Sequence, residues 1–132
     1  MVKKNKKIVA IVQARLTSKR FPKKVIQKIG KFTIVELILK RLQKSKLIDE
    51  IVFVIPSNQK NDKLYKILRG LKVNIFRGSE NNVLDRYYKA AKKYHAKNVM
   101  RVTGDCPLVD ARLIDKMISF FEKNYNSRYT KV

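Results

Sequence analysis

Short apolar runs rich in β-branched residues alternate with longer amphipathic segments along this 132-residue chain. A run without polar alternation is typical of a strand buried on both faces of a parallel sheet. Four such runs occur, at residues 8–12, 51–55, 73–76 and 98–102. Between and after them, apolar residues recur at helical spacing in four segments, at 34–42, 64–68, 83–91 and 113–121.

This alternation of strands and helices predicts an α/β fold in which helices cover both faces of a mostly parallel sheet. The length corresponds to one domain, spanning residues 1–132, and a composition of 45% hydrophobic and 32% charged residues is that of a globular chain. Asn61 and Asp62 are candidate caps for the second helix and Asp110 for the fourth. Gly70 is expected to supply a left-handed residue where the second helix ends.

The chain is strongly basic, with 32 Lys and Arg against 10 Asp and Glu and a net charge of +22. Its first acidic residue is Glu36. An anion-binding site is therefore expected near the N-terminus, although a generally lysine-rich surface would also explain part of the excess. The early apolar run is too short for a signal sequence or a membrane span, and the single cysteine cannot form an intramolecular disulfide. We therefore expect a cytoplasmic protein without a membrane partner.

The carboxyl ends of parallel strands are where α/β proteins bind ligands, so the loops at 14–24, 77–82 and 103–109 are the candidate site. The loop at 14–24 contains five cations and two hydroxyls, a composition that suits a triphosphate. It matches neither GxxxxGK[ST] nor GxGxxG. The alternative is a solvated basic loop without a ligand.

The other two loops offer complementary chemistry. Asp105 follows Gly104 at the end of the last strand, where a single carboxylate could hold Mg²⁺ together with phosphate and water. The alternative is that Asp105 only caps a turn. In the third loop, Arg77, Gly78 and Ser79 could read a base by its hydrogen-bonding edge, or the segment could be an ordinary turn capped by Ser79 or Asn82.

Taken in order, these segments resemble the CMP-sugar synthetases, the family of CMP-KDO synthetase and acylneuraminate cytidylyltransferase. Residues 14–24, ARLTSKRFPKK, resemble the family signature A-R-x-x-S-x-R-x-P-x-K. Three further segments resemble the branch named for spore coat polysaccharide biosynthesis protein F. They are FRGSE at 76–80, VLDRYY at 83–88 and RVTGDCPL at 101–108.

This resemblance implies a Rossmann-like, three-layer nucleotidyltransferase fold of the GT-A type, and transfer of CMP from CTP to a sugar acid with release of pyrophosphate. It implies that Arg15, Lys24 and Asp105 are catalytic, with Arg15 and Lys24 on the triphosphate and Asp105 on Mg²⁺. The nucleotide-binding residues implied are Ala14, Arg15, Ser18, Arg20, Lys24, Arg77, Gly78, Ser79 and Gly104. Of these, Ser18 and Arg20 would support the loop, and Arg77, Gly78 and Ser79 would lie against the cytosine and ribose.

Two departures from the family are visible. Lys23 stands where the family signature usually has glycine. Family members are also considerably longer, so we expect this chain to be the N-terminal, nucleotide-binding half. The acceptor-sugar pocket, a second metal carboxylate and any homodimer contacts would then lie in the other half. A nucleic-acid-binding module that uses the +22 charge and a noncatalytic interaction protein are the alternative functions.

Overall fold

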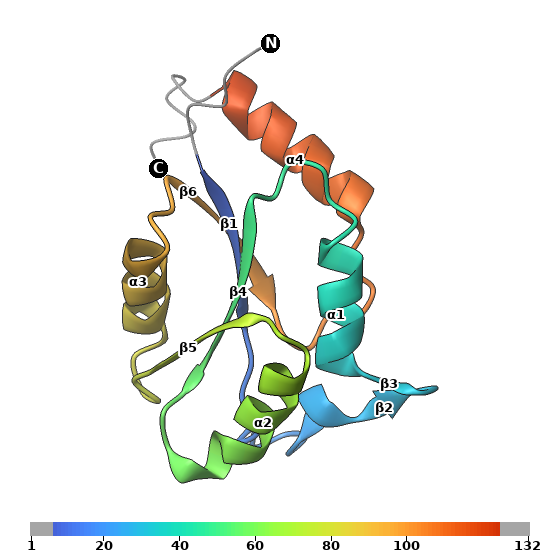
Figure 1. The fold of residues 1–132 in the computed structure, drawn as a ribbon, viewed down its shortest axis with the longest axis vertical. Coiled ribbons are helices and arrows are strands. Elements are labelled where there is room, and N and C mark those ends of the chain that lie inside the picture. Colours follow the sequence, from blue (N-terminus) through green and yellow to red (C-terminus); the bar gives the residue numbers. More distant parts are fainter. Residues whose placement is uncertain (1–6, 125–132) are drawn as a thin grey trace.

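The computed structural model of the protein describes residues 7–124 and shows a four-stranded parallel sheet with strand order β5-β4-β1-β6 (Figure 1). Its strands are β1 (Ile8–Gln13), β4 (Glu50–Pro56), β5 (Asn74–Gly78) and β6 (Asn98–Thr103). All three strand pairings are parallel. The four strands and their parallel arrangement confirm the sequence prediction.

Four α-helices also lie where the apolar spacing predicts them. They are α1 (Ile34–Leu42), α2 (Asp62–Gly70), α3 (Val83–Lys93) and α4 (Ala111–Lys123). A hairpin of two-residue strands, β2 (Lys28–Ile29) and β3 (Phe32–Thr33), was not predicted. Two short 3₁₀ turns, at Lys24–Ile26 and Gln59–Asn61, complete the elements.

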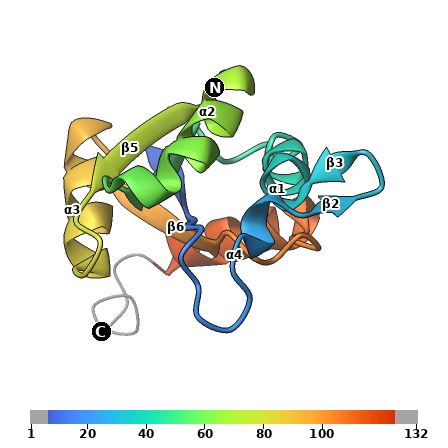
Figure 2. The ribbon, with the colours of Figure 1, turned by 90° about the horizontal axis from the view of Figure 1, so that it is seen from below.

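The helices form a layer on each face of the sheet, as Figure 2 shows, with α3 on one side and α1 and α4 on the other. Alternate residues of β1 divide between the two layers. Ala10 and Val12 belong to the larger core, which includes apolar residues of α1, α2 and α4. Val9 and Ile11 belong to the smaller core beneath α3. All four are fully buried, and this is why the run lacks polar alternation. The predicted three-layer sandwich is thereby confirmed.

The side of the sheet to which the chain adds strands reverses at β1, next to β6. From β1 the chain adds β4 and then β5 on one side, and it then returns to add β6 on the other side of β1. Open α/β sheets bind ligands outside the carboxyl ends of the strands at such a switch point, where the loops after neighbouring strands enclose a crevice. The two loops concerned are 14–24 and 104–109, which are the cationic loop and the loop of Asp105.

The caps expected at Asp110 and Asn82 are confirmed, whereas the side chains of Asn61 and Asp62 make no capping bond to α2 and Gly70 is not left-handed. The side chain of Asp110 accepts hydrogen bonds from the amides of Arg112 and Leu113, and that of Asn82 caps α3. Asn61 stands before α2, but its side chain makes no capping bond. Gly70 lies within α2, and the left-handed residue after the helix is Lys72, with φ 59°. Gly70 is the last residue of the helix, and Leu71 after it still has right-handed geometry.

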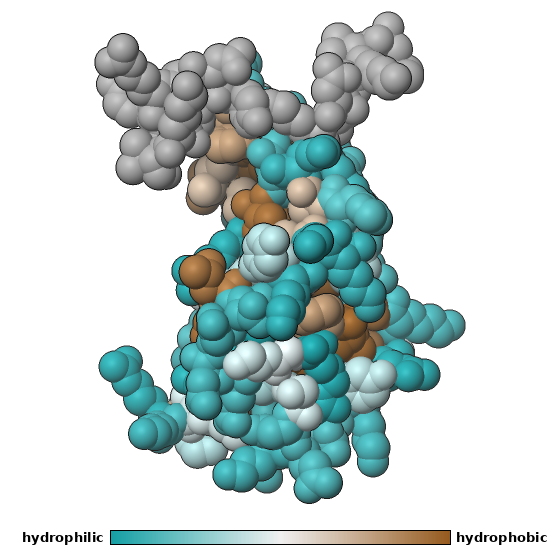
Figure 3. All heavy atoms as spheres, turned by 90° about the vertical axis from the view of Figure 1, so that its left-hand side faces the viewer, coloured by the Kyte–Doolittle hydropathy of each residue, from teal (hydrophilic) through white to brown (hydrophobic). Residues whose placement is uncertain are grey.

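The face that carries α3 is mostly hydrophilic, with small, separated hydrophobic patches (Figure 3). This agrees with the high proportion of charged residues in the sequence, 32%. Within residues 7–124, no helix combines the length and the apolar character that crossing a bilayer requires.

Candidate functional site

A polar cavity opens at the carboxyl ends of β1 and β6, where the strand order reverses. Its volume is about 290 Å³, and its lining includes Arg15, Lys24, Arg101, Gly104 and Asp105. A second hollow of about 600 Å³ adjoins it and extends along the loop at 17–21 toward Glu80 and Asn81. Four residues line both spaces, namely Arg15, Ser18, Lys24 and Asp105. Together the two hollows form one crevice, which we call the cationic crevice.

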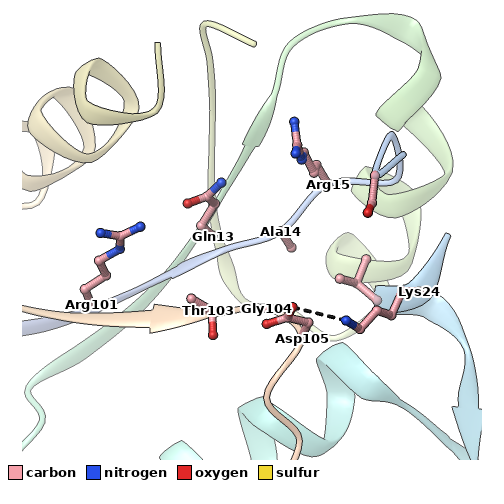
Figure 4. A pocket seen from close by; sticks show the side chains of 10 residues that line it. Gln13, Ala14, Arg15, Lys24, Arg101, Thr103, Gly104 and Asp105 are labelled. Atoms are coloured by element: carbon pink, nitrogen blue, oxygen red, sulfur yellow. Dashed lines mark hydrogen bonds and ion pairs between the residues drawn. The ribbon is translucent and has the colours of Figure 1, made fainter. Parts of the chain in front are cut away.

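The Lys24 and Asp105 side chains meet across this crevice from elements that are far apart in the sequence (Figure 4). The Lys24 Nζ lies 3.2 Å from the Asp105 Oδ2. The hydrogen bond from Lys24 lowers the pKa of the Asp105 carboxyl below its ordinary value. Asp105 is therefore ionised at neutral pH, and the pair is lost only as the pH falls through that lowered pKa. Both side chains remain partly exposed and can exchange partners.

The loop at 14–24 is held in shape by its own backbone. The Lys23 amide donates to the Leu16 carbonyl over 3.0 Å, and the Phe21 amide donates to the Ser18 hydroxyl over 3.5 Å. These bonds fold the loop back so that Lys24 points into the crevice. Lys23 itself has φ 58°, in the left-handed region that favours glycine. The departure from the family signature therefore falls at a residue where the backbone suits glycine.

Replacing Lys23 by glycine is expected to raise the free energy of unfolding by up to about 1 kcal/mol, because glycine removes the cost of a left-handed conformation. Lys23→Val is expected to lower it by more than about 1 kcal/mol, since a β-branched residue tolerates this φ poorly. The Lys23 side chain is exposed, so both changes act mainly through the backbone. Urea unfolding of the two variants measures the difference. Equal stabilities would contradict this account of the loop.

Gly104 allows the two sides of the crevice to approach each other closely. Its amide donates to the Gln13 carbonyl over 2.7 Å, next to the end of β1. A Cβ at this position would lie 2.4 Å from that carbonyl oxygen and 2.9 Å from the Ala14 Cβ. The glycine in front of Asp105 therefore permits the contact that sets the carboxylate beside the first loop.

The predicted set Arg77, Gly78 and Ser79 does not line the cationic crevice. Arg77 and Gly78 are the last residues of β5. The Arg77 guanidinium bonds the Pro56 and Asn58 carbonyls and pairs with Asp62 at 2.9 Å. It is therefore engaged beside α2, and the side chains that reach the crevice from this segment are the next two, Glu80 and Asn81. Arg20, by contrast, lines the crevice as expected.

Sequence reasoning did not single out several residues that the structure brings to the site. Arg101 and Thr103 line the cavity together because alternate residues of β6 point to the same face of the sheet. Arg86 of α3 is fully buried, and its Nη1 donates to the carbonyls of Ser79 and Glu80. Burial first, and then the positive charge of Arg15, lower the pKa of Arg86. The motif segments at 83–88 and 101–108 contain Arg86, Arg101 and Thr103, so a signal for all three was present.

The chemistry of the crevice is that of a site for a polyanion and one hard cation. The crevice is lined by guanidinium and ammonium groups and by two carboxylates, Asp105 in both hollows and Glu80 in the larger one. Among residues 7–124 no group of three or more His, Cys, Asp and Glu side chains could hold a metal ion by itself. Mg²⁺ commonly binds through one or two carboxylates and completes its shell with substrate phosphates and water. Asp105 suits that mode of binding, in which the ion arrives with its nucleotide.

Comparison with known proteins gives the same picture. Residues 9–132 match the family model described as cytidylyltransferase. A protein of Methanocaldococcus jannaschii described as uncharacterized is 43% identical over 118 residues, which are 89% of this chain and 49% of that protein. Spore coat polysaccharide biosynthesis protein SpsF of Bacillus subtilis is 35% identical, covering 84% of this chain and 48% of its own length.

The 3-deoxy-manno-octulosonate cytidylyltransferase of Geobacter sulfurreducens is 28% identical, covering 89% of this chain and 46% of its own. The solved structure of a cytidylyltransferase from Leptospira borgpetersenii superimposes with a TM-score of 0.86 at 37% identity, over 91% of this chain and 50% of that one. The chain thus spans about half the length of the curated relatives it matches. Both resemblances found in the sequence motifs are confirmed, and the family match extends over most of the chain. We conclude that this chain belongs to the cytidylyltransferase family.

Proposed function

We propose that this chain binds CTP with Mg²⁺ in the cationic crevice and contributes the nucleotide-binding part of a reaction that transfers CMP to a sugar acid. The observation that carries this proposal is the meeting of Lys24 and Asp105 at 3.2 Å, although the two residues are 81 positions apart. The pair brings an ammonium group and a carboxylate to one cavity, with the Arg15 guanidinium at its wall. These are the groups that a metal-bound triphosphate requires.

In the proposed reaction an acceptor hydroxyl oxygen attacks the α-phosphorus of CTP. A new oxygen–phosphorus bond forms, the bond to the β-phosphate breaks, and pyrophosphate leaves with the bonding electrons while the hydroxyl proton passes to solvent. Charge develops on the phosphoryl oxygens and on the leaving group. Fixed cations stabilise that charge without reorganising, which is the main contribution a protein makes to such a step. We assign this role to Arg15 and Lys24.

In this proposal the two members of the Lys24–Asp105 pair bind different parts of the ligand. Lys24 would bind a phosphate oxygen and Asp105 would hold the cation. Binding of the metal–nucleotide complex would therefore replace the Lys24–Asp105 ion pair with one contact to the phosphate and one to the metal. A bound Mg²⁺ would supply Lewis-acid polarisation of the phosphoryl oxygens. Ala14 and Gly104 would form the backbone floor, and Ser18 and Arg20 would keep the loop closed around the phosphates.

The base-binding assignment rests on the segment after β5. Because Arg77 is engaged beside α2, we propose that Glu80 and Asn81 are nearer the nucleotide than the Arg77 guanidinium. Gly78 and Ser79 would act through their backbone, which brings this segment toward the crevice. SpsF and the octulosonate cytidylyltransferase support a sugar or sugar-acid acceptor, by what their names describe.

Calorimetric titration with CTP in the presence of Mg²⁺ tests the nucleotide assignment. We expect saturable binding of one CTP per chain at physiological salt, with weaker binding of ATP and UTP. A short RNA serves as the control for net charge, because nonspecific affinity falls steeply as salt rises. RNA binding that equals CTP binding at physiological salt would contradict the proposal and favour the nucleic-acid alternative.

Pyrophosphate release tests the transfer step separately. The chain is incubated with CTP, Mg²⁺ and a panel of sugar acids, and pyrophosphate is measured enzymatically. Release that depends on one sugar acid supports cytidylyl transfer by this chain. CTP binding without release from any member of the panel would support the noncatalytic alternative.

Replacing Asp105 by asparagine is expected to have opposite effects with and without metal. Without metal, affinity for CTP rises, because one negative charge leaves a cavity that binds an anion. With Mn²⁺, the gain in CTP affinity that the metal provides falls by about 10- to 100-fold. Loss of residues that only hydrogen-bond to metal ligands in other proteins lowers metal affinity by the same range. Calorimetry gives the CTP affinities, and electron paramagnetic resonance of Mn²⁺ counts the bound ion. An unchanged metal dependence would exclude Asp105 as the ligand.

A further inference from the structure

Hydrogen-bonded side chains join the cationic loop to the segment after β5. The Leu16 amide donates to the Asn61 Oδ1 over 2.8 Å, and the Asn61 Nδ2 donates to the Asn58 Oδ1 over 2.8 Å. The Asn58 Nδ2 in turn donates to the Glu80 carboxylate. We call Asn58, Asn61 and Glu80 the inter-loop network. It spans three loops, which follow β1, β4 and β5.

The bond between Leu16 and Asn61 is buried, and burial makes it costly to break. Asn61 is fully buried, and the hydrogen bond it accepts from Leu16 is buried as well. A buried amide that loses its partners costs more free energy than the bond contributes when it is made. Because breaking this bond is costly, the turn before α2 stays packed against the loop at 14–24. It also explains why Asn61 does not cap α2, since its oxygen is already used by Leu16.

The far end of the network is fixed from beneath. The buried Arg86 guanidinium donates to the carbonyls of Ser79 and Glu80. Its aliphatic stem passes directly under Gly78, where an added Cβ would lie 2.9 Å from the Arg86 Cγ. Arg77 adds a bond of 2.8 Å to the Asn58 carbonyl. The backbone that carries Glu80 is therefore held in one position relative to Asn58.

We propose that the inter-loop network is a positioning device that sets the spacing between the loop for the triphosphate and the loop for the base and ribose. This inference rests on the proposed function and adds that the two halves of CTP are read by loops whose separation is fixed in advance. A ligand that spans two pre-positioned subsites gains affinity because little ordering remains to be done on binding. Breaking the network should weaken the intact nucleotide more than either of its parts.

Two substitutions of Glu80 separate the hydrogen bond from the charge. Glu80→Gln and Glu80→Met both remove the negative charge and keep a side chain of similar length. Only glutamine retains an oxygen that can accept from Asn58. We expect CTP to bind about tenfold more weakly to the Met variant than to the Gln variant, as loss of one such bond implies. For tripolyphosphate alone, and for CMP alone, the two variants should differ by less than about twofold.

Asn58→Ala is a second variant that cuts both links at their centre, and Asn58 lines neither part of the crevice. It should show the same pattern as Glu80→Met, and it remains informative if the Met variant is poorly folded. Each titration is accompanied by a thermal melt. A purely structural role predicts equal weakening of CTP, CMP and tripolyphosphate, together with a lower melting temperature.

The outcomes separate this inference from the function on which it rests. If the wild-type chain binds no CTP, the proposed function fails, and the positioning role fails with it. If the wild-type chain binds CTP and the Gln and Met variants bind it equally, only the positioning role is overturned. Weakening of all three ligands to the same degree overturns it also.

Discussion

Alanine at Arg15 or at Lys24 is expected to lower the affinity for CTP by about 10- to 100-fold, the effect of losing a charge-assisted hydrogen bond. Lys24 lies in the middle of the crevice and lines both of its parts, as does Arg15. The Arg15 side chain is exposed, so it is free to turn toward a phosphate. Calorimetry with CTP and Mg²⁺ measures the loss, and the double variant should bind too weakly to saturate.

Lys66→Ala is the matched control for charge. Lys66 is an exposed residue of α2 that lines neither part of the crevice, and its loss lowers the net charge by the same single unit. If the three variants weaken CTP binding equally, the affinity reflects only the general basic character of the chain. Unchanged binding by Arg15→Ala and Lys24→Ala would place the nucleotide elsewhere.

Gly104→Ala is expected to be the most destabilising of the substitutions considered. Its Cβ would meet the Gln13 carbonyl oxygen at 2.4 Å and the Ala14 backbone at 3.1 Å, so β1 and β6 would have to separate where they are hydrogen-bonded. Overpacking of this kind costs about 3 kcal/mol. For a chain of this size the melting temperature should fall by about 10 °C or more. Differential scanning calorimetry is the measurement.

Gly70→Ala is the control for removing a glycine. Gly70 lies in α2, and a Cβ there would have no other atom within 4 Å. Alanine is a better helix former than glycine, so the change should raise stability by up to about 1 kcal/mol. Both substitutions add the same methyl group, but their expected effects on the free energy of unfolding have opposite signs. A mild effect at Gly104 would show that the contact between β1 and β6 can relax, and would contradict its role in setting the carboxylate.

The positions of the main strands and helices could be read from the chain because tertiary packing and local pattern agree there. The run at 8–12 is apolar throughout because both faces of β1 are covered, and α3 and α4 begin beside residues that cap them. The β2–β3 hairpin was not predicted because two-residue strands have no periodicity to detect. Gly70 was misread because a glycine at the last position of a helix suggests a left-handed residue, whereas Gly70 is not left-handed. The left-handed residue proved to be Lys72, where composition gives no signal.

The site divides in the same way. Arg15, Ser18, Arg20, Lys24 and Asp105 could be placed together because the carboxyl ends of β1 and β6 share one edge of the sheet. The family resemblance assigns Arg77 to the cytosine and ribose, whereas in the structure its guanidinium donates to two carbonyls and pairs with Asp62. Asn61 looked like a helix cap, and its bond to Leu16 depends on how distant loops meet. Side-chain direction of this kind follows from tertiary structure.

The order of the strands also has a consequence for synthesis on the ribosome. β1 emerges first, but its pairing with β6, in which Ile8 is opposite Asn98, closes only when nearly the whole described chain has been made. Until then one edge of β1, which is apolar from Ile8 to Val12, has no neighbouring strand, and pairing across so long a separation is slow. The nascent polypeptide therefore forms the cationic crevice only after β6 has been made, and the incomplete sheet is the stage at which self-association would compete with folding.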